Sequence, residues 1–140
     1  MKRQGKDPLR GNVGVKADKS HSLRLLPYAI RENLPILGSQ RTLGGKTKAL
    51  ARWFTVDGSC TWYITEGSAR RTPDGKAVDY LLYGLVVGRG GQFDYFWLSD
   101  LVMHRSPNGL PIERDLRWRS KMLEQIAPEL FEAQEKEPED

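Results

Sequence analysis

The sequence has one cysteine, two histidines and no long apolar run, and each shortage argues against a class of protein. Cys60 alone cannot form an internal disulfide. His21 and His104 lie far apart and outside the spacings of zinc ligands, so we expect neither a metal site nor a cofactor. No apolar stretch reaches the roughly 20 residues that cross a bilayer, and the N-terminal residues lack the apolar core of a secretion signal. We therefore expect a cytoplasmic protein with no membrane contact.

Length and charge together define the expected domain organisation. A chain of 140 residues with 39% hydrophobic content can bury one core and is too short for two ordinary domains. Residues 1–24 carry seven Lys or Arg against two acids, and residues 124–140 carry seven acids against one Lys. The middle of the chain has 14 basic and nine acidic residues, a net charge of +5, so the basic character is not confined to one end. We expect a disordered basic segment at 1–24, a single domain at 25–127 and a disordered acidic tail at 128–140.

Alternating apolar residues between turn signals predict five strands. Loops this short favour antiparallel neighbours, because a parallel pair needs a crossover of a dozen or more residues. Apolar residues at helical spacing, with prolines or capping residues at the ends, predict short helices before and after the strands. The expected fold class is α+β, a single domain with a mainly antiparallel sheet and helices at both ends. The predicted strands are 48–56, 60–66, 80–87, 93–98 and 110–118, and the predicted helices are 25–34, 100–105 and 121–127.

The segment IERDLRW, residues 112–118, places a charge on an apolar face if it forms a strand. Strand alternation puts Arg114 on the same side as Ile112 and Leu116. A lone buried charge costs several kcal/mol, about 3 to 5 when its partner is removed, so Arg114 needs an anionic partner or a pocket that solvent reaches. Alternatively the strand frays and Arg114 extends outward along its aliphatic stem.

The segment CTWYITE, residues 60–66, raises the same problem with the opposite sign, because alternation carries Glu66 onto the face of Trp62 and Ile64. We therefore predict that Glu66 and Arg114 form a bidentate pair at a strand end. A pocket there would let Arg114 hold a carboxylate or phosphate. The predicted ligand or partner site comprises Glu66, Arg114, Trp62, Tyr63, Tyr95, Glu113, Asp115 and Arg117.

The large aromatic residues exceed what one small inner sheet face can accept. Either some of them lie on an outer face, or the terminal helices cover the second face and make all of them core. Exposed Tyr and Trp beside arginines suit base stacking on single-stranded nucleic acid as well as the anchoring of a protein partner. The rings concerned are Trp53, Trp62, Tyr63, Tyr80, Tyr83, Tyr95, Trp97 and Trp118.

Three segments carry a family resemblance: ARWFTVDGSCTWYITE, YGLVVGRGGQFDYFWLSDL and GLPIERDLRW, in that order and spacing. They resemble domain of unknown function family 2958, small proteins of plasmids and integrative conjugative elements. The similarity covers residues 34–122. The resemblance implies a cytosolic bacterial accessory protein encoded near conjugation, replication or antirestriction functions, and it supplies no catalytic residues. The chain departs from the family at Asp94 and Trp97 and in its basic loop at 67–79.

Our functional hypothesis is a non-enzymatic accessory binding protein of a mobile element that recognises a protein partner or an anionic ligand. One alternative is a hydrolase that uses Glu66, Glu113 and Asp115. The segment LGGKT suggests a phosphate loop, but Gln40 stands where that motif requires glycine. The other alternative is a nucleic-acid-binding protein that uses Arg70, Arg71, Lys76, Arg89, Arg105, Arg117 and Arg119.

Overall fold

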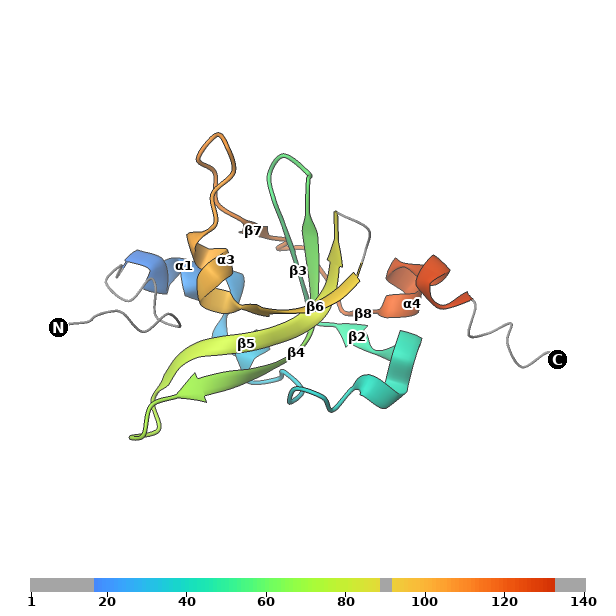
Figure 1. Cartoon of the computed structure of the whole chain (residues 1–140), viewed down its shortest axis with the longest axis horizontal. Helices are drawn as coiled ribbons and strands as arrows, with labels where there is room; N and C mark the ends of the chain where they lie inside the picture. Colours follow the sequence, from blue (N-terminus) through green and yellow to red (C-terminus); the bar gives the residue numbers. More distant parts are fainter. Residues whose placement is uncertain (1–16, 89–91, 133–140) are drawn as a thin grey trace.

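The structure is a computed structural model that describes residues 17–88 and 92–132. Its centre is a five-stranded antiparallel sheet with the strand order β6-β5-β4-β3-β7 (Figure 1). The α+β class and the antiparallel sheet that the sequence predicts are confirmed. The strands are β2 (Lys48–Ala49), β3 (Ala51–Phe54), β4 (Thr61–Arg71), β5 (Ala77–Val87), β6 (Gln92–Trp97), β7 (Glu113–Arg114) and β8 (Lys121–Met122). The helices are α1 (Ala17–Leu25), α2 (Tyr28–Arg31), η2 (Arg41–Lys46), α3 (Leu98–Met103), α4 (Leu123–Ile126) and η3 (Pro128–Leu130).

Two helices reach into the end segments that the sequence assigns to the tails. Residues 17–24 belong to α1, and residues 128–130 form η3, after which Phe131 is buried in a core. The rest of both predicted tails, residues 1–16 and 133–140, lies outside the described residues. None of the helices in the described part of the chain has the length and apolar character needed to cross a membrane.

Two of the predicted strands differ from the structure. The first one divides at Leu50 into β2 and β3, because β2 leaves the main sheet and pairs with β8. The last one shrinks to β7, because the amide of Trp118 donates to the carbonyl of Asp115 and turns the chain (3.2 Å). Leu116 is consequently 78% exposed although Ile112 is buried, so the shared face inferred from alternation is wrong.

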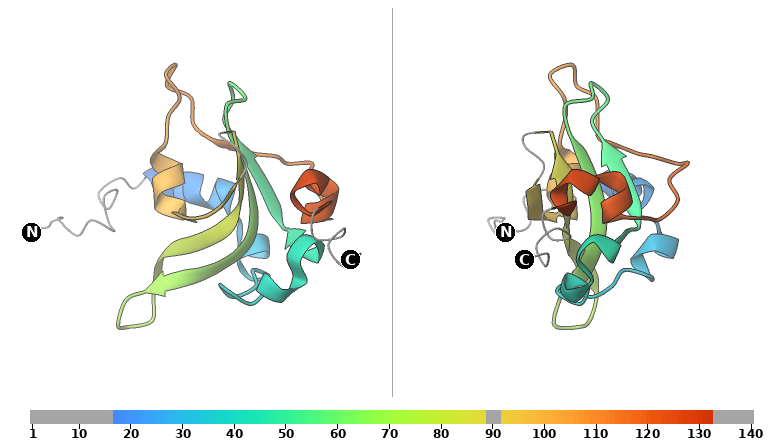
Figure 2. Two further views of the ribbon diagram at one scale, coloured as in Figure 1. Left: turned by 45° about the vertical axis from the view of Figure 1, so that its right-hand side comes forward. Right: turned by 90° about the vertical axis from the view of Figure 1, so that its right-hand side faces the viewer.

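Each face of the sheet carries its own hydrophobic core. On one face Trp53, Ile64 and Leu82 pack with residues of α1 and α3, and the Trp53 indole donates to the carbonyl of Leu25 (2.9 Å). On the other face Leu85 packs with residues of α4 and with Phe131. Figure 2 shows the sheet between α1 and α3 on one side and α4 on the other. Helices thus cover parts of both faces. Of the eight large rings, Trp53 is buried, Tyr95 is 49% exposed, and four others pack partly buried against a core: Trp62, Tyr63, Tyr80 and Trp118.

A β-bulge at Thr65 interrupts the pairing of β4 with β5. Ile64 lies opposite Gly84, but Glu66 lies opposite Tyr83, so Thr65 is an extra residue on β4. Its hydroxyl donates to the carbonyl of Tyr83 (3.1 Å). Because directly opposed residues share a face of the sheet, the bulge moves Glu66 from the face of Ile64 to the face of Tyr83.

Glycine at position 84 is required by the close approach of the two backbones at this bulge. A Cβ atom there would lie 1.9 Å from the carbonyl oxygen of Tyr63, and backbone atoms cannot move aside as a flexible side chain can. We expect Gly84→Ala to lower the free energy of unfolding by about 3 kcal/mol or more, measured by urea denaturation. In the control Gly58→Ala, where a Cβ meets open space but φ is +80°, we expect a cost of about 1 kcal/mol. Equal costs would contradict the close contact.

Candidate functional site

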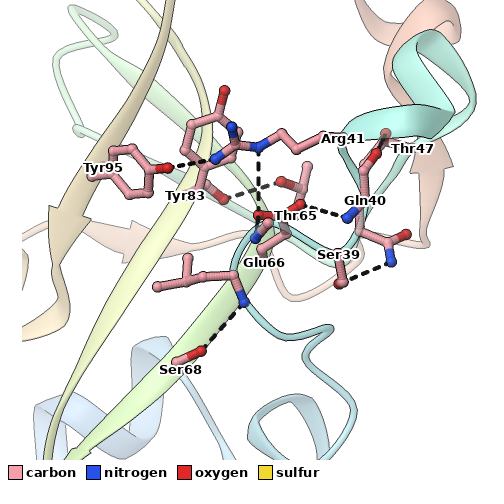
Figure 3. Close-up of polar contacts among 11 residues, drawn as sticks. Ser39, Gln40, Arg41, Thr47, Thr65, Glu66, Ser68, Tyr83 and Tyr95 are labelled. Carbon is pink, nitrogen blue, oxygen red and sulfur yellow. Dashed lines mark hydrogen bonds and ion pairs between the residues drawn. The ribbon is translucent and has the colours of Figure 1, made fainter.

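Glu66 is a buried carboxylate whose partners come from a loop early in the chain. Its side chain is only 1% exposed. One oxygen accepts a hydrogen bond from the amide of Gly38 (2.7 Å). The other accepts a hydrogen bond from the amide of Gln40 (2.9 Å), which is labelled in Figure 3. Two backbone hydrogen bonds satisfy both oxygens of a carboxylate that water does not reach. Glu66 therefore fixes the backbone of this loop.

The loop at residues 35–40 takes the place of a strand beside β4. Pairing between β3 and β4 ends at Ile64, and beyond it no strand among residues 17–88 and 92–132 lies along this edge of β4. The amide of Gly67 donates to the carbonyl of Pro35 (3.0 Å), and the amide of Leu37 donates to the hydroxyl of Ser68 (3.3 Å). A left-handed turn at Gly38, with φ of +88°, precedes the amide of Gln40 that reaches the carboxylate.

Arg41 follows this loop, and three side chains hold its guanidinium. Nε lies 3.9 Å from an oxygen of Glu66, and Nη2 donates to the hydroxyl of Tyr95 (Figure 3). The guanidinium carbon lies 4.2 Å from the centre of the Tyr83 ring, within the range of a cation–π contact. The hydrogen bond to Tyr95 raises the pKa of Arg41, and burial raises the pKa of Tyr83, so that its phenol is neutral at physiological pH. Arg41 is therefore a permanently charged donor, and its side chain is 44% exposed.

A pocket of about 170 Å³ opens beside Arg41. Its polar wall includes Gln40, Arg41 and Glu66, and its apolar wall includes Phe93 and Phe131. Pockets that bury drug-sized ligands measure about 300 to 1,000 Å³, so this one fits a group the size of a single side chain. Apolar walls with a positive donor select a small group that is partly apolar and carries a negative charge. Among the residues that the structure describes, no three His, Cys, Asp or Glu lie together as ligands for a metal.

The predicted pair of Glu66 and Arg114 is wrong. Arg114 lies opposite Trp53, and Trp53 lies opposite Trp62. Arg114 is therefore on the sheet face of Trp62, as alternation predicts. Glu66 is on the other face because of the bulge at Thr65, which strict alternation does not include. Instead of pairing with a carboxylate, the Arg114 Nε donates to a backbone carbonyl of α1, at Arg24 (2.6 Å).

The two other predicted carboxylates form ion pairs away from Glu66. Glu113 lies 3.6 Å from Arg24, and Asp115 lies 3.2 Å from Arg52. The carboxylates of the hydrolase hypothesis are thus held by separate partners.

The remaining members of the predicted site are also dispersed. Trp62 packs edge-on against His104, and Tyr63 packs against Trp118 in the second core. Arg117 is exposed, and its backbone amide donates to the side chain of Asp115 (3.0 Å). Tyr95 is the predicted residue that does join Glu66, through Arg41.

The basic residues of the nucleic-acid hypothesis that the structure describes belong to three separate segments. Arg70, Arg71 and Lys76 belong to the β4–β5 hairpin, which lies at the lower left of Figure 1. Arg105 lies in the segment between α3 and β7. Arg117 and Arg119 lie between β7 and β8, and Arg89 lies outside the described residues.

Arg41 and the two amide donors have no counterpart among the predicted site residues, and Tyr83 is predicted only as one of the large aromatic rings. The segment around Gln40 and Arg41 resembles a phosphate loop that lacks a required glycine, and it carries no other signal. Gln40 and Glu66 are 26 positions apart in the sequence. One signal was present, because an acid at the end of an apolar strand requires donors from elsewhere. Nothing in the sequence identifies which loop supplies them.

Comparison with known proteins supplies no relative: no family model, curated protein or solved structure matches the chain. The site must therefore be interpreted from its own geometry.

Replacing Glu66 by Gln tests its structural role. The amide side chain retains one acceptor but places an NH₂ against one of the two backbone donors. We expect Glu66→Gln to lower the free energy of unfolding by about 1 to 3 kcal/mol and to accelerate hydrogen exchange at the amides of Gly38 and Gln40. The matched control is Glu113→Gln, at a partly exposed ion pair, which should cost less than about 1 kcal/mol. Unchanged exchange at both amides would contradict the assignment.

Proposed function

We propose that this protein is a non-enzymatic binding module that captures an anionic side chain of a protein partner in the Arg41 pocket. The observation that carries the proposal is the guanidinium of Arg41, held by Glu66, Tyr83 and Tyr95 at a pocket with mostly apolar walls. An arginine positioned in advance loses little side-chain entropy when it binds a carboxylate. No described residue accepts a hydrogen bond from its Nη1 atom, which leaves donors for a ligand.

The environment of Glu66 supports recognition over turnover. A general acid or base needs access to the proton that it transfers, but both oxygens of Glu66 accept backbone amides and the side chain is buried. We infer that Glu66 is a positioning residue, which holds the loop and orients Arg41.

Charge and pocket size support a protein partner. The chain has a net charge of +4, which favours acidic partners. Single pockets that accept one side chain are typical anchor points of protein interfaces. The basic residues of the nucleic-acid alternative that the structure describes lie on three separate segments, whereas a phosphate backbone requires several neighbouring cations. The resemblance to proteins of plasmids and conjugative elements supports our proposal that the setting is the cytoplasm of a bacterium that carries mobile DNA.

Benzoate is a suitable probe because it combines an apolar ring with a carboxylate. In an NMR titration we expect benzoate to shift the resonances of pocket residues, and we expect Arg41→Gln to weaken binding about tenfold, since hydrogen bonds to charged groups are among the stronger ones. Benzamide, which has the same ring and no charge, should bind weakly to both proteins.

The matched control is Arg52→Gln, because Arg52 also stacks on a ring and pairs with a carboxylate but lies away from the pocket. It should leave benzoate binding unchanged. Shifts that centre on Arg114, or equal binding by the Arg41→Gln protein, would contradict the proposal.

Salt dependence separates this function from nucleic-acid binding. We expect weak binding of single-stranded DNA at about 0.15 M salt, because the described basic residues of this alternative belong to separate segments of the fold. Fluorescence anisotropy over a range of salt concentrations measures it. Tight binding that falls steeply as salt rises, and that survives Arg41→Gln, would favour the nucleic-acid alternative.

A further inference from the structure

The strand β6 is an open edge of the sheet. It pairs with β5 on one side, and no described strand lies on its other side. Residues 92–95 are exposed, in contrast to the interior strands. The strand contains no proline, lysine or register shift, which are features that commonly protect an edge from pairing with another chain.

Two backbone amides of β6 point away from the sheet. The amide of Tyr95 donates to the side chain of Asp94 (2.8 Å), so it is not used in the ladder with β5. Because successive residues of a strand alternate in the direction of their backbone groups, the amide of Phe93 points the same way. The carboxylate of Asp94 thus occupies a position where the carbonyl of an added strand would bind.

The open edge is continuous with the Arg41 pocket. Phe93 and Tyr95 are 37% and 49% exposed, and both rings contact Tyr83, at centroid distances of 5.9 Å and 4.8 Å. Phe93 also lines the pocket, and the hydroxyl of Tyr95 accepts from Arg41. Phe93 and Tyr95 thus connect the free edge of β6 to the guanidinium and its pocket.

We propose that the partner binds as an extended segment that adds a strand to the free edge of β6 and places an acidic side chain in the Arg41 pocket. This inference rests on the proposed function and specifies the form of its ligand. In strand addition the backbone hydrogen bonds supply affinity, and pockets for alternate side chains supply specificity. Here the backbone partners are the amides of Phe93 and Tyr95, and the specificity pocket belongs to Arg41.

Charge argues against a second copy of this chain as the occupant. Antiparallel pairing of β6 with its own copy about Asp94 brings two carboxylates into opposed positions, which is destabilising. An acidic segment from another protein has no such conflict, and its carboxylate would be a second anion for Arg41 beside Glu66.

The test begins with selection of binders from a displayed library of random linear peptides. We expect enriched sequences to place one acidic residue among β-branched and aromatic residues. Changing that acid to its amide should weaken binding about tenfold. N-methylation removes a backbone donor without altering a side chain. The peptide is therefore N-methylated either at its odd or at its even positions. Only the set whose amides face β6 should weaken binding, by about tenfold.

Variants of β6 test the same pairing from the side of the protein. Phe93→Pro and Phe93→Ala both remove the ring, but only proline removes the outward amide. We expect the proline variant to bind the selected peptide about tenfold more weakly than the alanine variant. Asp94→Ala should strengthen binding several-fold, because it frees the amide of Tyr95 from its internal acceptor. Peptide binding should slow hydrogen exchange at the amides of residues 93 and 95.

The outcomes separate this inference from the function on which it rests. A peptide that needs its acid and Arg41, but tolerates N-methylation at either set of positions, leaves the proposed function intact and overturns strand addition. Failure to enrich any acidic peptide overturns strand addition, whereas the benzoate titration still decides the role of Arg41. A dimer that forms with rising concentration and is lost in the Phe93→Pro protein identifies a second copy as the occupant and also overturns the proposal. If Phe93→Pro fails to fold, the N-methylated peptides decide.

Discussion

One extra residue in a strand, the bulge at Thr65, determines where the polar site of this protein lies. Without it Glu66 would lie on the face of Ile64, within the core that α1 and α3 cover. With it, Glu66 lies on the face of Tyr83, at an edge of β4 that the loop at 35–40 borders instead of any described strand. Bulges commonly redirect a side chain beside a functional site. The close approach at Gly84 shows that the rest of the sheet is built around this irregularity.

The buried carboxylate then organises residues that are distant in sequence. It gathers two backbone amides from the loop at 35–40, and this loop ends at the arginine whose guanidinium lies over Tyr83. Burying a charge is costly unless donors surround it, so the loop and the carboxylate stabilise each other. The same arrangement leaves a positive group at an apolar pocket next to an open strand edge. This is the surface that we propose binds an acidic, extended partner.

The sequence predicts the antiparallel sheet because its apolar alternation and turn residues repeat over several strands. It also identifies Glu66 as a buried charge that needs partners. The sequence pairs Glu66 with the wrong cation, Arg114. Both residues follow the same apolar alternation, and alternation carries no information about a bulge. Arg41 lies in a polar loop without periodicity, and its place beside Glu66 depends on tertiary contacts alone. The predicted strand at 110–118 is longer than β7 for a local reason, because a turn begins at Asp115.

The proposed binding site requires that Arg41, and not Arg114, is the cation that Glu66 orients. A double-mutant cycle measures this directly, from the free energies of unfolding of Glu66→Gln, Arg41→Gln and the double variant, with a second cycle that pairs Glu66 with Arg114. The structure predicts a coupling free energy between Glu66 and Arg41 that exceeds experimental error, and additive effects for Glu66 and Arg114. Additive effects in the first cycle, together with coupling in the second, would contradict it.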